Sequence, residues 1–124
     1  MTLVFSPKGD GLSKVFKDYQ EGALKIIWQN AEGMSSRLAW EKVNEKLESG
    51  RSMSRASIIK FLNDMVDMGV IDYHEESCKG GYRRIYKPKM DESELKIFIA
   101  KTVLSSLMRD FPEETTAAIN GLNT

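Results

Sequence analysis

The chain has 124 residues, enough for one modest domain with an appended element. Its 18 Lys plus Arg balance 18 Asp plus Glu, and 41% of the residues are hydrophobic, which is typical of a soluble globular protein. No apolar run is long enough to cross a membrane, the N-terminus lacks the basic region of a signal peptide, and a single cysteine excludes an internal disulfide. We therefore expect a cytoplasmic protein with no membrane partner.

Two helices are predicted in the first 50 residues. Apolar residues at helical spacing predict the first over about 13–30, with Ser13 as its N-cap. Gly33 suits the position just after that helix. A second helix is predicted over roughly 36–48, with a serine at its start as the N-cap: Ser35 or Ser36.

A third helix and a hairpin are predicted next. Ser54 can cap a helix over 55–68, and Gly69 can end it at the first position beyond the C-cap. Two β-prone runs follow, at 70–76 and 82–87. The five residues between them, SCKGG, include two glycines, so these runs are expected to form a β-hairpin.

The C-terminal part is predicted to be a long helix from Asp91 to about Asp110, opened by a capping box of Asp91 and Glu94. A short helical turn or a frayed tail is expected after it. Three helices followed by a hairpin predict an α+β, mostly α, winged helix-turn-helix fold with a long C-terminal dimerisation helix. The expected organisation is a flexible lead-in at 1–13, a winged helix-turn-helix DNA-binding domain at 14–89 and the dimerisation helix at 90–124.

Positive charge gathers on two elements of this predicted domain. In a winged helix the third helix enters the major groove of DNA, and the hairpin, or wing, lies on neighbouring phosphates. Asp64 and Asp67 come late in the third helix, where it would already have left the groove. We therefore predict double-stranded DNA as a partner. The expected contacts are basic and hydroxyl side chains of the second helix, the third helix and the wing: Ser36, Arg37, Ser54, Arg55, Ser57, Lys60, Lys79, Arg83, Arg84 and Lys87.

The long C-terminal helix carries apolar residues close to a heptad stripe, and such a stripe needs a cover. One solution is that the helix folds back onto the first helix of its own chain. We favour pairing between two copies, because half-site recognition requires a two-fold partner. The predicted dimerisation residues are Leu95, Phe98, Ile99, Thr102, Val103 and Leu107.

Three motifs resemble the penicillinase-repressor family of winged-helix repressors. "EGALKIIW" (21–28) is similar to a pattern in the family's first helix, and "ASIIKFLNDMVDMGVI" (56–71) is similar to its recognition helix. The aromatic-x-Pro element at 86–88, followed by "DESE" (91–94), resembles the end of its wing. The resemblance covers about residues 15–110. It implies a dimeric repressor that binds a palindromic operator through the winged helix and pairs through the C-terminal helices.

The resemblance also implies roles for single positions. Ser57 and Lys60 stand where the family has two groove-facing threonines, so Lys60 implies a different operator. Asp64 and Met68 replace an Arg and a Lys that the family usually has, so two expected phosphate contacts are missing. The cysteine pairs of the copper-responsive branch are absent, and no copper response is implied.

The sequence contains no set of residues at a spacing suited to catalysis or metal binding. The only histidine, His74, lies in a predicted strand, and its acidic neighbours and Cys78 match no zinc template. We expect no enzyme activity, no cofactor and no metal.

The predicted function is a sequence-specific double-stranded DNA-binding transcriptional regulator, a repressor that acts as a homodimer on a palindromic operator. The alternative is a winged-helix protein–protein interaction module in a transcription or signalling complex, which the neutral net charge, Asp64 and Asp67 favour.

Overall fold

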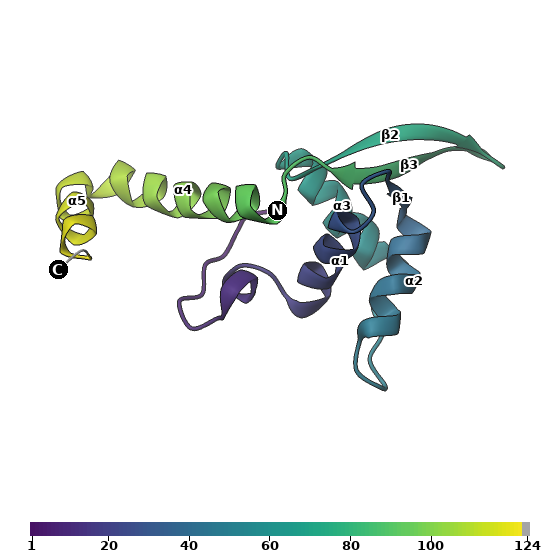
Figure 1. The fold of residues 1–124 in the computed structure, drawn as a ribbon, viewed down its shortest axis with the longest axis horizontal. Helices are drawn as coiled ribbons and strands as arrows, with labels where there is room; N and C mark the ends of the chain where they lie inside the picture. The colour runs from purple at the N-terminus through teal and green to yellow at the C-terminus, as the bar shows by residue number, and fades with distance from the viewer. Residues whose placement is uncertain (123–124) are drawn as a thin grey trace. The chain divides into compact units, whose positions relative to one another are not determined.

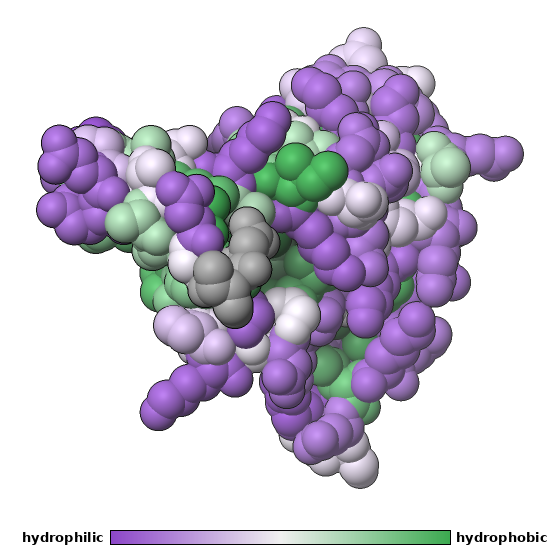
Figure 2. All heavy atoms as spheres, turned by 60° about the vertical axis from the view of Figure 1, so that its left-hand side comes forward, coloured by the Kyte–Doolittle hydropathy of each residue, from purple (hydrophilic) through white to green (hydrophobic). Residues whose placement is uncertain are grey.

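The computed structural model describes residues 1–122. The chain separates into two compact units, Met1–Asp91 and Glu92–Thr124, and each is described by itself. Figure 1 shows helices and a long projecting hairpin in the first unit, and helices alone in the second. On the face drawn in Figure 2, hydrophilic side chains predominate and hydrophobic ones reach the surface in smaller patches. No helix in the described part of the chain has both the length and the apolar character to span a membrane.

The elements follow the predicted order and confirm the α+β, mostly helical winged-helix fold. The first unit contains the 3-10 helix η1 (Gly11–Lys14), α1 (Asp18–Trp28), β1 (Met34–Ser35), α2 (Ser36–Lys46), α3 (Arg55–Asp67), β2 (Ile71–Cys78) and β3 (Gly81–Pro88). The second unit contains α4 (Glu92–Asp110) and α5 (Pro112–Gly121).

The core of the first unit forms where α1, α2 and α3 pack together. Phe61 of α3 is 2% exposed, and its ring meets the edges of two other aromatic rings, with centroids 5.9 Å from Phe16 and 6.3 Å from Tyr19. These contacts fix which face of α3 points inward. The other buried side chains of the three helices are Ala23, Leu24, Ile26, Ile27, Ala39, Val43, Ile58, Leu62 and Met65.

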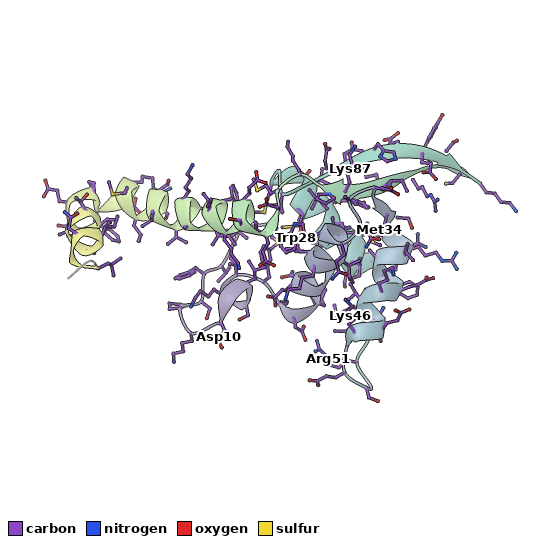
Figure 3. All side chains as sticks on the ribbon, viewed as in Figure 1. Asp10, Trp28, Met34, Lys46, Arg51 and Lys87 are labelled. Atoms are coloured by element: carbon purple, nitrogen blue, oxygen red, sulfur yellow. The ribbon has the colours of Figure 1, made fainter. Side chains whose placement is uncertain are left out.

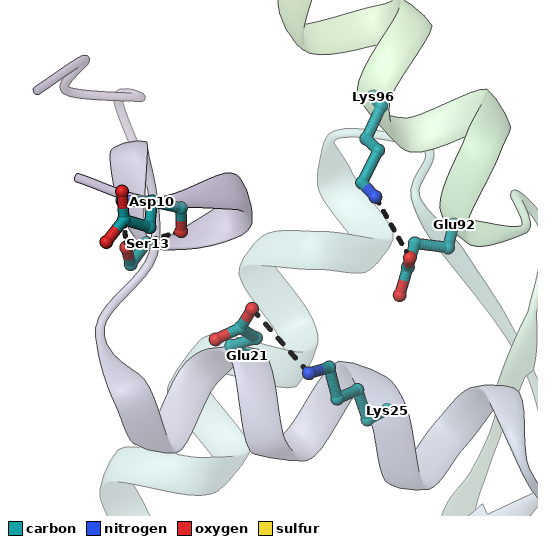
Figure 4. Close-up of polar contacts among 6 residues, drawn as sticks. All are labelled: Asp10, Ser13, Glu21, Lys25, Glu92 and Lys96. Atoms are coloured by element: carbon teal, nitrogen blue, oxygen red, sulfur yellow. Dashed lines mark hydrogen bonds and ion pairs between the residues drawn. The ribbon is translucent and has the colours of Figure 1, made fainter. Parts of the chain in front are cut away.

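The first helix begins later than predicted, and Ser13 does not cap it. Ser13 lies in η1, where its hydroxyl donates to the carbonyl oxygen of Asp10 at 2.6 Å and accepts from the Asp10 N–H at 2.8 Å (Figure 4; Asp10 is also labelled in Figure 3). The backbone is then extended at Lys17, so α1 can begin only at Asp18. The Lys17 N–H donates to the side-chain oxygen of Gln20 at 2.9 Å. This bond satisfies one of the donors that a helix start leaves free.

The short strand β1 is not predicted by the sequence, and Gly33 explains it. Gly33 was expected to end the first helix, but α1 stops earlier, and Gly33 instead has φ of 106°. A Cβ atom there would lie 2.7 Å from Ile85 Cγ2 and 3.2 Å from the backbone carbonyl oxygen of Tyr86. Only glycine lets the backbone approach β3 this closely. Met34 and Ser35 then pair with Tyr86 and Ile85, and Figure 3 shows Met34 beside the sheet.

The hairpin is longer and its turn tighter than predicted. The sheet has the order β1-β3-β2, and β2 pairs with β3 from Ile71–Pro88 to Cys78–Gly81. The connection was expected to be five residues long. It is shortened to Lys79 and Gly80, because Ser77, Cys78 and Gly81 join the ladder. The two strands therefore form an extended wing.

The second unit contains one helix more than was predicted. The stretch after Phe111 was expected to be a short turn or a frayed tail, but Pro112–Gly121 forms a helix. Pro112 suits the first turn, where its missing N–H is not needed, and the Thr115 hydroxyl donates to the Phe111 carbonyl at 2.7 Å. On α4, Lys96 pairs with Glu92 at 3.0 Å (Figure 4). Such a pair supports an exposed helix only modestly.

Candidate nucleic-acid interface

The loop before α3 is held in place by two side chains of α2. The Trp40 indole N–H donates to the Met53 carbonyl at 2.7 Å. Asn44 contacts the same residue twice, because its side-chain oxygen accepts from the Met53 N–H at 2.8 Å and its Nδ2 donates to the Met53 carbonyl at 3.2 Å. The next residue, Ser54, caps α3 as predicted and accepts from the Ser57 N–H at 3.1 Å. The start of α3 is therefore fixed relative to α2.

The outward side of α3 carries fewer of the predicted contact residues than the sequence indicated. Its exposed side chains include both predicted cations, Arg55 and Lys60. Asp67 is also exposed, as expected for the later turns. Ser57 is half-buried at the edge of the helix, and the Ser54 hydroxyl is engaged with Ser57, donating to its Oγ at 2.9 Å. Arg55 and Lys60 are thus the side chains of α3 best placed to reach DNA.

Lys60 has an acidic neighbour on its own helix. Its ammonium lies 3.0 Å from a carboxylate oxygen of Asp64, one turn later. The Lys60 side chain is 75% exposed, although that of Asp64 is only 18% exposed, and an ion pair open to solvent at one end contributes little to stability, so a DNA phosphate or a guanine can replace Asp64 as the partner of Lys60. Asp64 also sets the direction of the Lys60 side chain before DNA arrives.

The wing is less basic than its second strand alone. β2 carries Asp72, Glu75 and Glu76, and the register places Glu76 opposite Arg83 and Asp72 opposite Lys87. Arg83 and Glu76 form an ion pair of 2.9 Å, whereas Lys79 is exposed at the turn. Figure 3 shows Lys87 on the hairpin, near its base. The predicted cations are therefore on one ribbon, but acidic side chains partly offset them.

Arg84 points to α3 and not to the solvent in front of the wing. Its guanidinium donates to the side-chain oxygen of Asn63 at 3.1 Å and lies 4.0 Å from the centroid of the Tyr73 ring. The hydroxyl of Tyr86 donates to the same Asn63 oxygen at 2.6 Å. We call these four residues, Asn63, Tyr73, Arg84 and Tyr86, the helix–wing clamp, because they tie the recognition helix to the wing.

The chemistry of the clamp depends on Tyr86 remaining protonated. Burial raises the pKa of the Tyr86 phenol above its usual range, against smaller opposing effects of Arg84. At neutral pH the phenol is therefore a donor, and Asn63 must present its oxygen and not its amide nitrogen.

Sequence reasoning missed Asn63. The one available signal was a polar side chain on α3 beside the buried stripe, which does not identify a partner in a strand more than 20 residues later.

We predict that Asn63→Ala lowers the free energy of unfolding of the DNA-binding unit by about 1–3 kcal/mol, because it leaves a buried phenol and a guanidinium without their acceptor. Urea denaturation measures this loss, and Asn120→Ala, at an exposed position of α5, is the control. Since the folded-state pKa of Tyr86 is raised, its contribution is complete at neutral pH and is lost only as the pH rises through that pKa. Equal stability of the two Ala variants would show that the clamp contributes nothing.

The N-terminus of α2 holds two further predicted contacts. Ser35, not Ser36, is the N-cap, and its hydroxyl accepts from the Leu38 N–H at 3.2 Å. Arg37 is exposed and lies 3.3 Å from Glu41 on the same helix. The Arg37 side chain, on the first turn of α2, can reach an anion such as a phosphate at this helix N-terminus. Within residues 1–122, no three possible metal ligands come together.

Known proteins were compared with this chain both by sequence and by structure. A search of curated proteins gives no match. Among solved structures, the PcaV transcriptional regulator from Streptomyces coelicolor in complex with its natural ligand is similar, with 16% sequence identity and a TM-score of 0.47, over 87% of this chain and 72% of that chain.

The family described as penicillinase repressor matches residues 18–121, from the first residue of α1 to the last residue of α5. The match extends over most of the chain and confirms the family that the motifs in the first helix, the recognition helix and the wing resemble. A chain of this family is a DNA-binding transcriptional regulator and not an enzyme. This chain belongs to the penicillinase-repressor family.

Proposed function

We propose that the chain is a repressor that binds a palindromic operator as a homodimer. Each copy inserts the N-terminal half of α3 into a major groove and lays its wing on the flanking phosphates. Repression follows because the bound dimer occupies the operator. The observation that carries this proposal is the pair of exposed cations, Arg55 and Lys60, on the capped helix α3. Hydrogen bonds fix the start of this helix to α2 and its outer side to β3, the basic strand of the wing.

The proposed contacts form three groups. Arg55 and Lys60 read base edges, since both can donate to the guanine acceptors of the major groove. Phosphate contacts come from the wing and from the start of α2. In that group we place Lys79 and Arg83, with Lys87, Ser36 and Arg37 as further contacts. Ser54, Ser57 and Arg84 act by positioning, because their polar groups are already engaged within the protein.

Support for the homodimer comes from two apolar faces of α4. The first is the predicted heptad stripe, in which Leu95 is buried, Thr102 is exposed and the other members, Phe98, Ile99, Val103 and Leu107, are half-buried. A second face, which sequence reasoning missed, carries Ile97, Leu104 and Met108, which are 54%, 41% and 40% exposed. Residues 7 and 11 positions apart share a face of an α-helix. A helix apolar on two faces is typically buried on both, and one further chain supplies the cover.

The second candidate function is a protein-interaction module. The acidic strand β2 and the pairing of Arg83 with Glu76 favour it, because both reduce the field that would attract DNA. It differs from the first proposal in one measurable respect, since a protein adaptor has no reason to prefer a DNA sequence.

Enrichment from a random pool of duplex DNA tests the proposal. We expect the protein to select an inverted repeat, with half-sites separated by about one helical turn of DNA or a multiple of it. The same selection with Arg55→Ala/Lys60→Ala is the control, and it should lose the motif. Recovery of no common sequence by the wild-type protein would refute the repressor proposal and favour the adaptor.

A further inference from the structure

A groove next to the recognition helix has no role in the proposed DNA contacts. It encloses about 360 Å³ between the N-terminal residues 1–4, the segment that opens α1, and one edge of α3. Four α3 residues line it: Ser57, Lys60, Phe61 and Asp64. The groove therefore touches a side chain on which DNA binding is proposed to depend.

The N-terminal ammonium of Met1 lies 3.9 Å from a carboxylate oxygen of Asp64 on α3, and hydrogen bonds hold the loop that follows residues 1–4. The Ser6 N–H donates to the Lys14 carbonyl at 2.7 Å. The Lys14 ammonium in turn donates to the carbonyls of Pro7 at 3.0 Å and Gly9 at 2.6 Å. These bonds fold residues 6–14 into a compact loop, so the chain before it is directed along α3.

The lining combines an apolar body with three ammonium groups, those of Lys17 and Lys60 and the N-terminus of Met1. Val4, Val15 and the half-buried ring of Tyr19 supply apolar surface, and Phe61 lies beneath them. Lys17 and Lys60 supply positive charge. This combination suits a small molecule that is apolar at one end and anionic at the other.

The charges of the lining favour an anion over a cation. Asp64 is the one acidic side chain in the groove lining, and two cations already pair with it: Lys60 at 3.0 Å and the N-terminal ammonium of Met1 at 3.9 Å. Lys17 has no acidic partner in the part of the chain that the structure describes, and it is exposed. The ammonium of Lys17 is therefore the uncompensated charge of the site. The Ser57 hydroxyl accepts from Ser54 but keeps its own proton to donate, so it and the Gln20 amide add hydrogen-bond donors at the same rim.

We propose that this groove binds a small organic carboxylate with an apolar body, and that the bound carboxylate lowers the affinity for DNA. The carboxylate lies between Lys17 and Lys60, and its apolar part contacts Tyr19 and Val15. Lys60 cannot donate fully to this carboxylate and to DNA at the same time, so the ligand and the operator compete for one side chain. The effect on DNA rests on the proposed function, whereas binding of the ligand itself does not.

The test uses the full chain and three probes that share a carboxylate but differ in the apolar part: benzoate, cyclohexanecarboxylate and hexanoate. Benzamide, which has the shape of benzoate without its charge, and sodium chloride at matched ionic strength are the controls. Two-dimensional amide NMR reports where each probe binds, and fluorescence anisotropy reports affinity for DNA with and without the probe.

We expect at least one carboxylate to shift the amide signals of Lys17, Tyr19 and Ser57 at millimolar concentration, while benzamide and chloride do not. Lys17→Ala should weaken that binding about ten-fold, the loss of one charge-assisted hydrogen bond. Its DNA affinity without the probe should remain unchanged, because Lys17 is not a proposed DNA contact. Lys46→Ala, which removes an exposed lysine at the end of α2, should leave both unchanged.

Three results would overturn the proposal: no shift of the groove signals with any of the three carboxylates, equal binding of benzamide, or a bound carboxylate that leaves DNA affinity unaltered. Shifts in the groove combined with no DNA binding at all, even without a probe, would instead refute the proposed function and leave the anion site standing.

Discussion

Replacing Ile97 and Leu104 together by Glu should convert the proposed homodimer to a monomer. Both side chains lie on the second apolar face of α4 and are largely exposed in the single chain. In a dimer they would become buried, and a buried unpaired carboxylate is strongly unfavourable. Affinity for an inverted repeat should then fall by about 10²- to 10⁴-fold, the gain that linking two binding sites typically gives.

Lys101→Glu is the matched control, because at an exposed polar position of the same helix it makes the same change in net charge as the two Glu substitutions on the apolar face. It corrects for the repulsion between added carboxylates and DNA. Light scattering coupled to size-exclusion chromatography measures the mass, and anisotropy measures DNA affinity. A variant that remains dimeric, or a wild-type protein that is already a monomer, would contradict pairing through α4.

Replacing Arg55 and Lys60 together by Ala should abolish most of the preference for one sequence. Each good contact to a base edge is worth about 1–3 kcal/mol of discrimination, and a dimer makes every contact twice. We therefore expect the ratio of operator affinity to mixed-sequence affinity to fall by about 100-fold or more. Competition titrations with operator and mixed-sequence duplexes give this ratio directly.

The control removes the same charge elsewhere. Lys46→Ala/Lys101→Ala deletes two exposed cations, at the end of α2 and in the middle of α4, that have no proposed contact to DNA. It should leave the affinity ratio unchanged. An unchanged ratio in Arg55→Ala/Lys60→Ala as well would show that α3 does not read the sequence.

The order of the elements and the core of α3 could be predicted from the sequence because they depend on local signals. The Ser54 cap and the apolar residues at helical spacing define α3, and Gly69, with φ of 79°, ends it as predicted. The hairpin follows from two β-prone runs around glycines. These features are set by residues near one another in the chain, which is why sequence periodicity finds them.

Features that depend on distant residues could not be predicted in this way. The strand β1 exists because Gly33 approaches Ile85, 52 positions later, and a lone glycine signals only a turn. The sequence gives Arg84 the same appearance as Arg83, yet Arg84 lies against Asn63 and Tyr73 while Arg83 pairs with Glu76. The pairing register distinguishes them, and register is a property of the folded hairpin.

The net charge of the wing could not be predicted for the same reason. The stretch from Ser77 to Lys89 contains only basic charge, and read alone it indicates a strongly positive ribbon. Folding places Asp72, Glu75 and Glu76 beside it. Prediction of the electrostatic character of a wing therefore requires both strands in register, not the more basic one alone.

The most direct test of the central claim is the salt dependence of DNA binding by the wild-type protein, measured by fluorescence anisotropy on duplex DNA. If the protein binds DNA phosphates, the logarithm of its affinity falls linearly with the logarithm of the salt concentration, with a slope of about −0.9 for each phosphate neutralised. Lys79→Ala/Arg83→Ala should reduce that slope, because each copy loses two proposed phosphate contacts. No binding even at low salt would contradict the account and make the wing a protein-binding surface.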